Sequence, residues 1–241
     1  MRLSLSSAGL KDWAGDVLVV GLLNEESDQD RAVLSERFPG LETALEQQAF
    51  KAKPSDQVVL HPLQEGGPSR LIVLGLGDAA GLSLDGVRAA AARAAKASIG
   101  CNGSLGLLLP WKDLEATTVA QVTAEAVLLA SYKDQRFRKE PEPRRVPEAL
   151  ELIGLPQNAA SGLTPVAAHC AGVNLARQLV AAPPNVVTPA ALADTAAELA
   201  RDYGLELNVL ERTDCEARGM GAFLAVSQGS DLDPKFLHLI Y

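Results

Sequence analysis

Short apolar runs alternate with helix-like segments through the first half of the chain, and this alternation restricts the possible folds more than any other feature. The runs predicted as strands are 2–6, 16–23, 57–62, 70–76 and 105–109, and the segments predicted as helices are 30–38, 41–50, 84–99 and 118–132. The run at 17–23 is almost wholly apolar, which is typical of a strand covered on both faces. Strands that alternate with helices predict a layered α/β domain with a largely parallel sheet.

The composition is that of an ordinary globular protein. Of the 241 residues, 47% are hydrophobic and 22% are charged, which provides enough apolar surface to offset the entropy of ordering the chain. No apolar run approaches the roughly 20 residues of a membrane span, and the first residues do not form a signal peptide. We therefore expect a soluble, cytoplasmic protein with no membrane partner.

Charge and cysteine usage narrow the possible partners further. The net charge is −8, so the surface as a whole repels phosphate backbones and we do not expect a nucleic-acid partner. The three cysteines, Cys101, Cys170 and Cys215, are widely separated and form no C-x-x-C pair. This spacing favours reduced thiols over a disulfide framework or a zinc site.

The segment 133–147 interrupts the periodic pattern with three prolines and a dense mixture of charges. Its basic residues are Lys133, Arg136, Arg138, Lys139, Arg144 and Arg145. Acidic residues offset them, and only Phe137 could stack on a base. We interpret the segment as a solvated linker, and it is the best candidate for a domain boundary.

Beyond this boundary the periodic pattern resumes. The predicted elements are a strand at 150–155, helices at 164–180 and 189–203, and strands at 205–209, 222–227 and 236–241. Thr188 is expected to cap the second helix and Pro189 to open it. The last six residues form an apolar strand with no turn or cap after it, so we expect the chain to be the front portion of a longer protein.

A glycine-rich turn follows the predicted strand at 70–76. Gly75, Gly77 and Gly81 would let a pyrophosphate approach the N-terminus of the next helix, which Ser83 is expected to cap. The spacing departs from the usual dinucleotide fingerprint, however, and the next strand does not end in an acidic residue. We interpret the segment as a tight strand-to-helix turn, with nucleotide binding near 75–83 as the alternative.

No other group of residues forms a convincing site. His169 and Cys170 are adjacent on a predicted helix and therefore point about 100° apart, unlike a nucleophile and its base. His238 lies in an apolar strand, and Asp231 and Asp233 flank a turn, where packing and turn roles are usual. We assign no catalytic, metal-binding or cofactor-binding residue in this sequence.

Two sequence blocks resemble the leucyl aminopeptidase (cytosol aminopeptidase) family. They are residues 174–189, with Asn-Leu-Ala-Arg-Gln-Leu and Pro-Pro-Asn-Val-Val-Thr-Pro, and residues 218–230, from Arg-Gly-Met-Gly-Ala-Phe to Gln-Gly-Ser. Residues 81–83 and 131–137 are similar to the variable N-terminal domain of that family. Gln178, Ala181 and Ala182 depart from the residues that the family more often has.

The resemblance implies a macro-like N-terminal α/β domain at 1–135, a linker at 136–160 and the beginning of a catalytic metallopeptidase domain at 161–241. The implied protein is a metal-dependent aminopeptidase that releases N-terminal residues, leucine among them, from peptides. It would bind two divalent metal ions, manganese or zinc, and assemble as a hexamer.

The metal-binding and catalytic motifs of that family do not occur in these residues, so we expect this chain alone to be inactive. Asn185 and Met220 are interpreted as structural, the first as a turn residue before a helix and the second as a core residue. The alternative function is a stand-alone macro-like module that binds a nucleotide or a partner near 75–83.

Overall fold

The computed structural model describes residues 1–24, 29–62, 66–111, 113–143 and 145–241. The chain divides into two compact units, Met1–Leu175 and Ala176–Tyr241. Within the described residues, no helix is long and apolar enough to cross a membrane.

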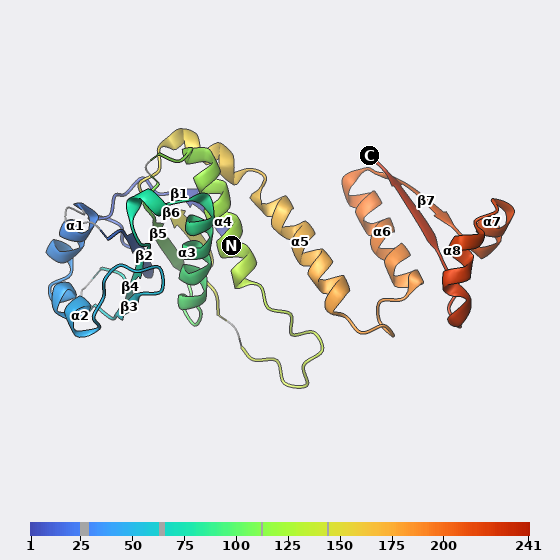
Figure 1. Cartoon of the computed structure of the whole chain (residues 1–241), viewed down its shortest axis with the longest axis horizontal. Coiled ribbons are helices and arrows are strands. Elements are labelled where there is room, and N and C mark those ends of the chain that lie inside the picture. Colours follow the sequence, from blue (N-terminus) through green and yellow to red (C-terminus); the bar gives the residue numbers. More distant parts are fainter. Residues whose placement is uncertain (25–28, 63–65, 112, 144) are drawn as a thin grey trace. The chain divides into compact units, whose positions relative to one another are not determined.

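The first unit is built on a six-stranded sheet (Figure 1). In spatial order its strands are β1 (Arg2–Leu5), β6 (Ala149–Leu152), β5 (Ser104–Leu108), β2 (Val17–Leu22), β4 (Arg70–Gly75) and β3 (Gln57–Leu60). Neighbouring strands are parallel except for β3, which runs antiparallel to β4. The predicted α/β class with a largely parallel sheet is confirmed.

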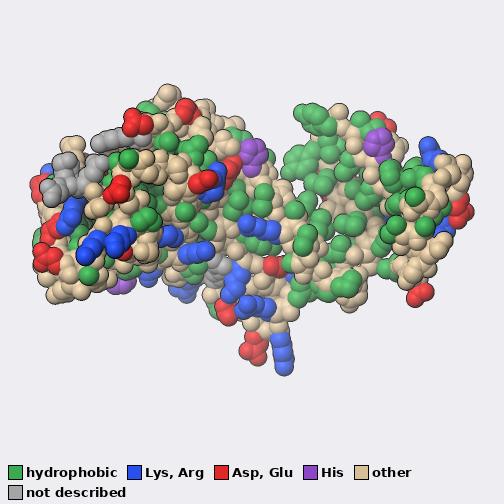
Figure 2. Space-filling model, in the orientation of Figure 1, with side chains coloured by type: hydrophobic (Ala, Val, Ile, Leu, Met, Phe, Trp, Pro, Cys, Tyr) green, Lys and Arg blue, Asp and Glu red, His purple; other side chains and the backbone are tan. Residues whose placement is uncertain are grey.

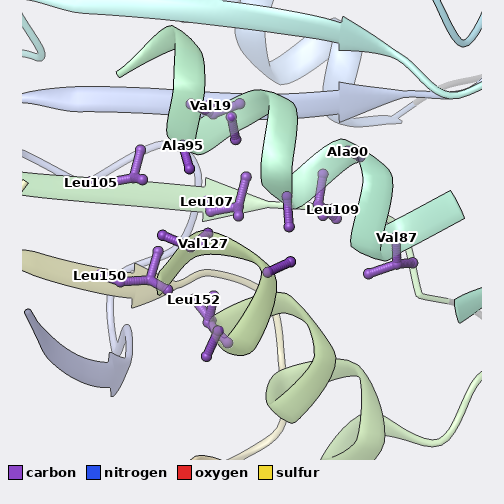
Figure 3. Close-up of a cluster of buried hydrophobic side chains, with 14 of the residues drawn as sticks. Val19, Val87, Ala90, Ala95, Leu105, Leu107, Leu109, Val127, Leu150 and Leu152 are labelled. Carbon is purple, nitrogen blue, oxygen red and sulfur yellow. The ribbon is translucent and has the colours of Figure 1, made fainter. Parts of the chain in front are cut away.

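Helices cover both faces of this sheet, because the strand side chains alternate between two hydrophobic cores. Leu18 and Val20 pack into one core with α1 (Gln29–Arg37) and α2 (Leu41–Gln47). Val17 and Val19 pack into the other, with α3 (Leu84–Ala97) and α4 (Ala116–Ser131), as Figure 3 shows for Val19. The strands of the sheet interior are therefore apolar on both sides, as the sequence predicted.

Helix ends follow the predicted capping chemistry. The side chain of Ser83 accepts a hydrogen bond from the backbone N–H of Gly86 and caps α3. Thr188 accepts one from Ala191 at the start of α6 (Pro189–Tyr203), and Gly204 ends that helix in the left-handed region at φ 68°. Both predicted N-caps are confirmed.

After α4 come β6, the 3-10 helix η2 (Gln157–Leu163) and α5 (Val166–Ala181), and the division between the two units falls within α5. Strand β6 falls inside the predicted linker at 136–160, and it lies between β1 and β5 in the sheet. Helix η1 (Ala79–Gly81) forms the turn before α3. The predicted domain limits stay a prediction.

The second unit combines α6 with an antiparallel pair of strands, β7 (Glu206–Leu210) and β8 (Phe236–Ile240). Between them lie α7 (Arg212–Ala217), α8 (Gly221–Val226) and the 3-10 helix η3 (Ser227–Gly229). Hydrophobic side chains occupy much of the face of this unit that Figure 2 shows, and Val226 is 88% exposed.

The strand predicted at 222–227 is wrong, because residues 222–226 belong to α8 and Ser227 begins η3. An apolar run of six residues is too short for its periodicity to separate a strand from a helix. The backbone N–H of Leu224 donates to the carbonyl of Met220, and the ring of Phe223 packs edge-on against Phe236 at 5.7 Å. The packing of a helical turn against β8 decides between the two structures.

Candidate functional site

The glycine-rich turn at the carboxyl end of β4 is a closed backbone network. The N–H of Gly75 donates to the carbonyl of Asp56 at 2.9 Å, and the N–H of Gly77 donates to that of Ala52 at 2.7 Å. The N–H of Leu76 donates to Leu22 at the end of β2. A phosphate-binding turn needs such N–H groups to point at the ligand. Here they are occupied by carbonyls, which supports the tight-turn interpretation.

The neighbouring end of the sheet is filled by side chains. Ligands of open α/β sheets commonly bind beyond the carboxyl ends of the strands. The usual position is between two adjacent strands whose following connections run in opposite directions along the sheet. In this sheet that position lies between β2 and β5. A Cβ added at Gly21 of β2 would lie 2.6 Å from Leu76 and 2.8 Å from Leu109. Two leucine side chains therefore cover the face of β2 near its carboxyl end.

His169 and Cys170 contact different atoms of the same residue, Glu125. Nδ1 of His169 lies 2.8 Å from Oε1 of Glu125 on α4, while buried Cys170 directs its thiol toward the Glu125 carbonyl at 3.9 Å. Partial burial disfavours the charged form of Glu125, but hydrogen bonds from His169 and Gln121 outweigh it and lower the pKa of Glu125. The Glu125–His169 pair joins residues 44 positions apart, so sequence spacing gave no signal for it.

The segment predicted as a linker contains a loop held by its own side chains. Gln135 and Glu142 exchange two hydrogen bonds of 2.8 and 2.9 Å, and Lys133 and Arg138 both pair with the Glu142 carboxylate. Arg136 binds Asp134, and this hydrogen bond lowers the pKa of Asp134 to about 2. Arg144 of the predicted basic cluster lies outside the described residues. The positive charges described here are thus partly neutralised within the loop.

The polar candidates of the second unit serve local structure. Asp233 accepts a hydrogen bond from Arg212 at 3.1 Å, whereas Asp231 is exposed. His238 is also exposed and lies opposite Asn208 in the β7–β8 pair. No catalytic arrangement joins these three side chains.

Asn185 and Met220 were both expected to have structural roles, and only the position of Asn185 is as expected. Asn185 lies in the turn before α6, as expected. Met220 is only half-buried, and its backbone N–H donates to Cys215 at the start of α8, so the expected core position is wrong. A residue that precedes a short surface helix keeps part of its side chain in solvent.

Metal-binding chemistry needs several ligands that converge on one point. Across the described part of the chain, no three His, Cys, Asp or Glu side chains lie close enough together to hold a metal ion. The assignment of no catalytic, metal-binding or cofactor-binding residue stays a prediction.

Comparison with protein families gives two consecutive matches. Residues 17–141 match the model of the cytosol aminopeptidase family, N-terminal domain, and residues 174–241 match its catalytic domain. The chain aligns over its full length with a probable cytosol aminopeptidase of Parasynechococcus marenigrum at 69% identity and with one of Prochlorococcus marinus at 52% identity. It spans 49% of the length of each relative.

Solved structures give the same result. A variant of tomato leucine aminopeptidase superposes on 99% of the chain with a TM-score of 0.88 at 28% identity, and the match covers 50% of that protein. The bottromycin maturation enzyme BotP, in complex with Mn, superposes on 94% of the chain with a TM-score of 0.70 at 26% identity, over 45% of its own length. With two family models matched in order along the sequence, this chain belongs to the cytosol aminopeptidase family.

Proposed function

We propose that the whole protein is a metal-dependent aminopeptidase that releases N-terminal residues from peptides, and that these 241 residues form its scaffold. The observation that supports this most strongly is the match of 99% of the chain to a leucine aminopeptidase. The curated relatives, at up to 69% identity, are named probable cytosol aminopeptidases. The chain spans about half of their length, so the activity is proposed for the whole protein.

The described residues do not fit a two-metal centre. Two cations held about 4 Å apart need several converging carboxylates or nitrogen ligands, and no such group occurs among them. We propose that manganese or zinc binds instead to residues in the part of the relatives' length that this chain does not span. The Mn named in the BotP complex supports a divalent metal for the proposed enzyme.

The organisation proposed for the chain follows the family models, which match on either side of residue 150. Residues 1–135 would form the macro-like domain, 136–160 the linker and 161–241 the start of the catalytic domain. Peptides are the proposed substrates, a homo-oligomer such as a hexamer the proposed assembly, and the cytoplasm the proposed location.

The alternative of a stand-alone nucleotide-binding module is not favoured. The backbone N–H groups of Gly75, Leu76 and Gly77 already donate to carbonyls. The comparisons point to a peptidase family over both halves of the chain.

Hydrolysis of leucine p-nitroanilide tests the proposal. The purified chain should show no turnover with added manganese or zinc. The same chain fused to the C-terminal half of the Parasynechococcus relative, 69% identical over the shared part, should be active with one of these metals. Turnover by the chain alone would reveal a metal site in these residues, and an inactive, folded, metal-loaded fusion would contradict the proposed activity.

A further inference from the structure

A second crevice of the α/β type lies at the carboxyl ends of β1, β6 and β5. These three strands are parallel neighbours, so their carboxyl ends share one edge of the sheet. The chain leaves β1 and crosses the sheet to β2, whereas it leaves β6 toward η2, which packs against β1. The two connections therefore run in opposite directions along the sheet, which is the arrangement that opens a ligand crevice.

The two connections also depart to opposite faces of the sheet. After β1, Leu10 and Trp13 enter the core that α1 and α2 cover. After β6, Leu155 and Ala159 pack in the core that α3 and α4 cover. A cavity of about 490 Å³ lies between the loops that diverge in this way, a size typical of small-molecule sites. This crevice is open, whereas leucine side chains cover the corresponding end of β2.

The lining of the cavity is polar but uncharged. It consists of residues 6–9 after β1, Trp111 after β5 and residues 154–157 after β6. Among these described residues there is no aspartate, glutamate, lysine, arginine or histidine. A charged ligand would give up part of its hydration there and meet no opposite charge. The lining therefore favours an uncharged ligand.

Backbone hydrogen-bond donors are available on two sides of the crevice. The N–H groups without an acceptor among the described residues are those of Ser7, Gly9, Gly154 and Leu155. The carbonyls of Gly9 and Gly154, in contrast, already accept hydrogen bonds from the N–H of Trp13 and the indole of Trp111. Free donors beside occupied carbonyls favour a ligand that carries acceptors.

Trp111 supplies an aromatic surface that is held in place. Its indole N–H donates to the carbonyl of Gly154 at 3.1 Å, which joins the loops after β5 and β6. The side chain packs against the core beside α4 and remains half-buried. A tryptophan fixed in this way stacks on a planar ligand with little loss of rotamer freedom.

We propose that this crevice binds an uncharged, planar heteroaromatic ligand with ring carbonyl groups, of the xanthine or pyrimidinedione type. The ring stacks on Trp111, and the ring carbonyl oxygens accept hydrogen bonds from the N–H groups of the two facing loops. The site lies wholly within the first unit, so its occupation does not depend on the proposed peptidase activity.

Nuclear magnetic resonance of the nitrogen-15-labelled chain tests this proposal with caffeine, which is planar and uncharged and has two ring carbonyls but no N–H group. The chain contains two tryptophans, and Trp13 is 2% exposed. We expect caffeine to shift the indole N–H signal of Trp111 and the amide signals of Gly9 and Gly154 saturably, with the Trp13 indole unchanged. Indole, which is planar but has no carbonyl, should bind about tenfold more weakly.

Two pairs of variants locate caffeine on the protein, with the Gly154 amide as the signal. Gly9 and Gly81 both have an ordinary φ and no atom within 4 Å of an added Cβ. Gly9→Leu should fill the crevice and abolish saturable binding, whereas Gly81→Leu, outside the lining, should leave it unchanged. Trp111→Leu should weaken binding about tenfold more than Trp111→Phe, which keeps an aromatic ring. Thermal unfolding shows whether each variant is folded, and the comparison of caffeine with indole uses the unchanged protein.

Four results would overturn the proposal. The first is the absence of saturable shifts at caffeine concentrations up to about 1 mM, the weakest affinity of interest. The second is indole binding as tightly as caffeine, and the third is equal caffeine binding by Gly9→Leu and Gly81→Leu. The fourth is a shift of the same signals by glucose and not by caffeine, since the crevice would then take a polyol.

Discussion

Replacing Gly75 by alanine should destabilise the first unit strongly, because the new methyl group would overlap the backbone. The added Cβ would lie 2.1 Å from the carbonyl oxygen of Lys53 and 2.5 Å from the carbonyl carbon of Ala52. Neither atom moves freely, since the Ala52 carbonyl accepts from the N–H of Gly77 and the Lys53 carbonyl accepts from the N–H of Asp56. Overpacking together with a weakened hydrogen bond should cost about 2–4 kcal/mol of unfolding free energy.

The other two glycines of the turn provide matched comparisons. Gly77 has a φ of +78°, and its Cβ would lie 3.2 Å from Pro54, so alanine there should cost about 1–2 kcal/mol through the left-handed conformation. Gly81 has an ordinary φ and no atom within 4 Å of an added Cβ. Alanine at 81 should be neutral or stabilise by up to about 1 kcal/mol, because it restricts the unfolded chain.

Urea unfolding followed by circular dichroism measures all three changes. The expected order of destabilisation is Gly75→Ala, then Gly77→Ala, then Gly81→Ala, with unchanged denaturant slopes. Equal effects at 75 and 81 would refute the steric argument. Calorimetric titration with ADP-ribose should show no binding to the unsubstituted chain, and binding that Gly75→Ala abolishes would restore the nucleotide-site alternative.

Three further predictions follow from single contacts. Thr123 is 3% exposed and its hydroxyl has no partner among the described atoms. Thr123→Val should therefore raise the unfolding free energy by about 1 kcal/mol in urea titrations. A lower unfolding free energy would show that the hydroxyl is hydrogen-bonded. Hydrogen bonds from Thr118 and Thr117 lower the pKa of the capping residue Glu115 from 4.5 to about 2. The Glu115 carboxylate therefore stabilises the fold above pH 4.5 and loses its contribution as pH falls toward 2. Glu115→Gln should flatten the pH dependence of the melting temperature between these values. An unchanged slope would contradict the capping role of Glu115. Trypsin should cut first after Arg138 or exposed Lys139. The two cleaved pieces should elute together in gel filtration, because β6 lies between β1 and β5 in the sheet. Separate elution would contradict that placement of β6.

Local chemistry explains why most elements of the fold could be predicted. The buried strand at β2, the cap at Ser83 and the proline that opens α6 each follow from a few neighbouring residues. The pairing of β6 with β1 joins residues 147 positions apart, which no local pattern encodes. The bond from Nε1 of Trp13 to Glu151, at 2.9 Å, is equally remote in sequence.

The candidate sites show the same difference between local patterns and contacts that are remote in sequence. Adjacent helix positions were enough to separate His169 from Cys170, but the Glu125–His169 contact arises only when α5 packs on α4. The charged segment at 133–147 suggested a solvated linker, because composition records how many charges a segment has and not how they pair. The pairing of Lys133 and Arg138 with Glu142 is a property of the folded loop.

Several carboxylates of the second unit are held in local contacts. Glu211 and Asp214 cap α7 reciprocally, with the backbone N–H of Glu211 donating to Asp214 at 2.9 Å. Asp233 pairs with Arg212, and Glu206 accepts from Asn208, each at 3.1 Å. A metal ion would have to displace these donors and draw together side chains from separate turns. These acids hold the turns beside β7 and β8, which supports the proposal that the metal ligands lie in the part of the relatives' length that this chain does not span.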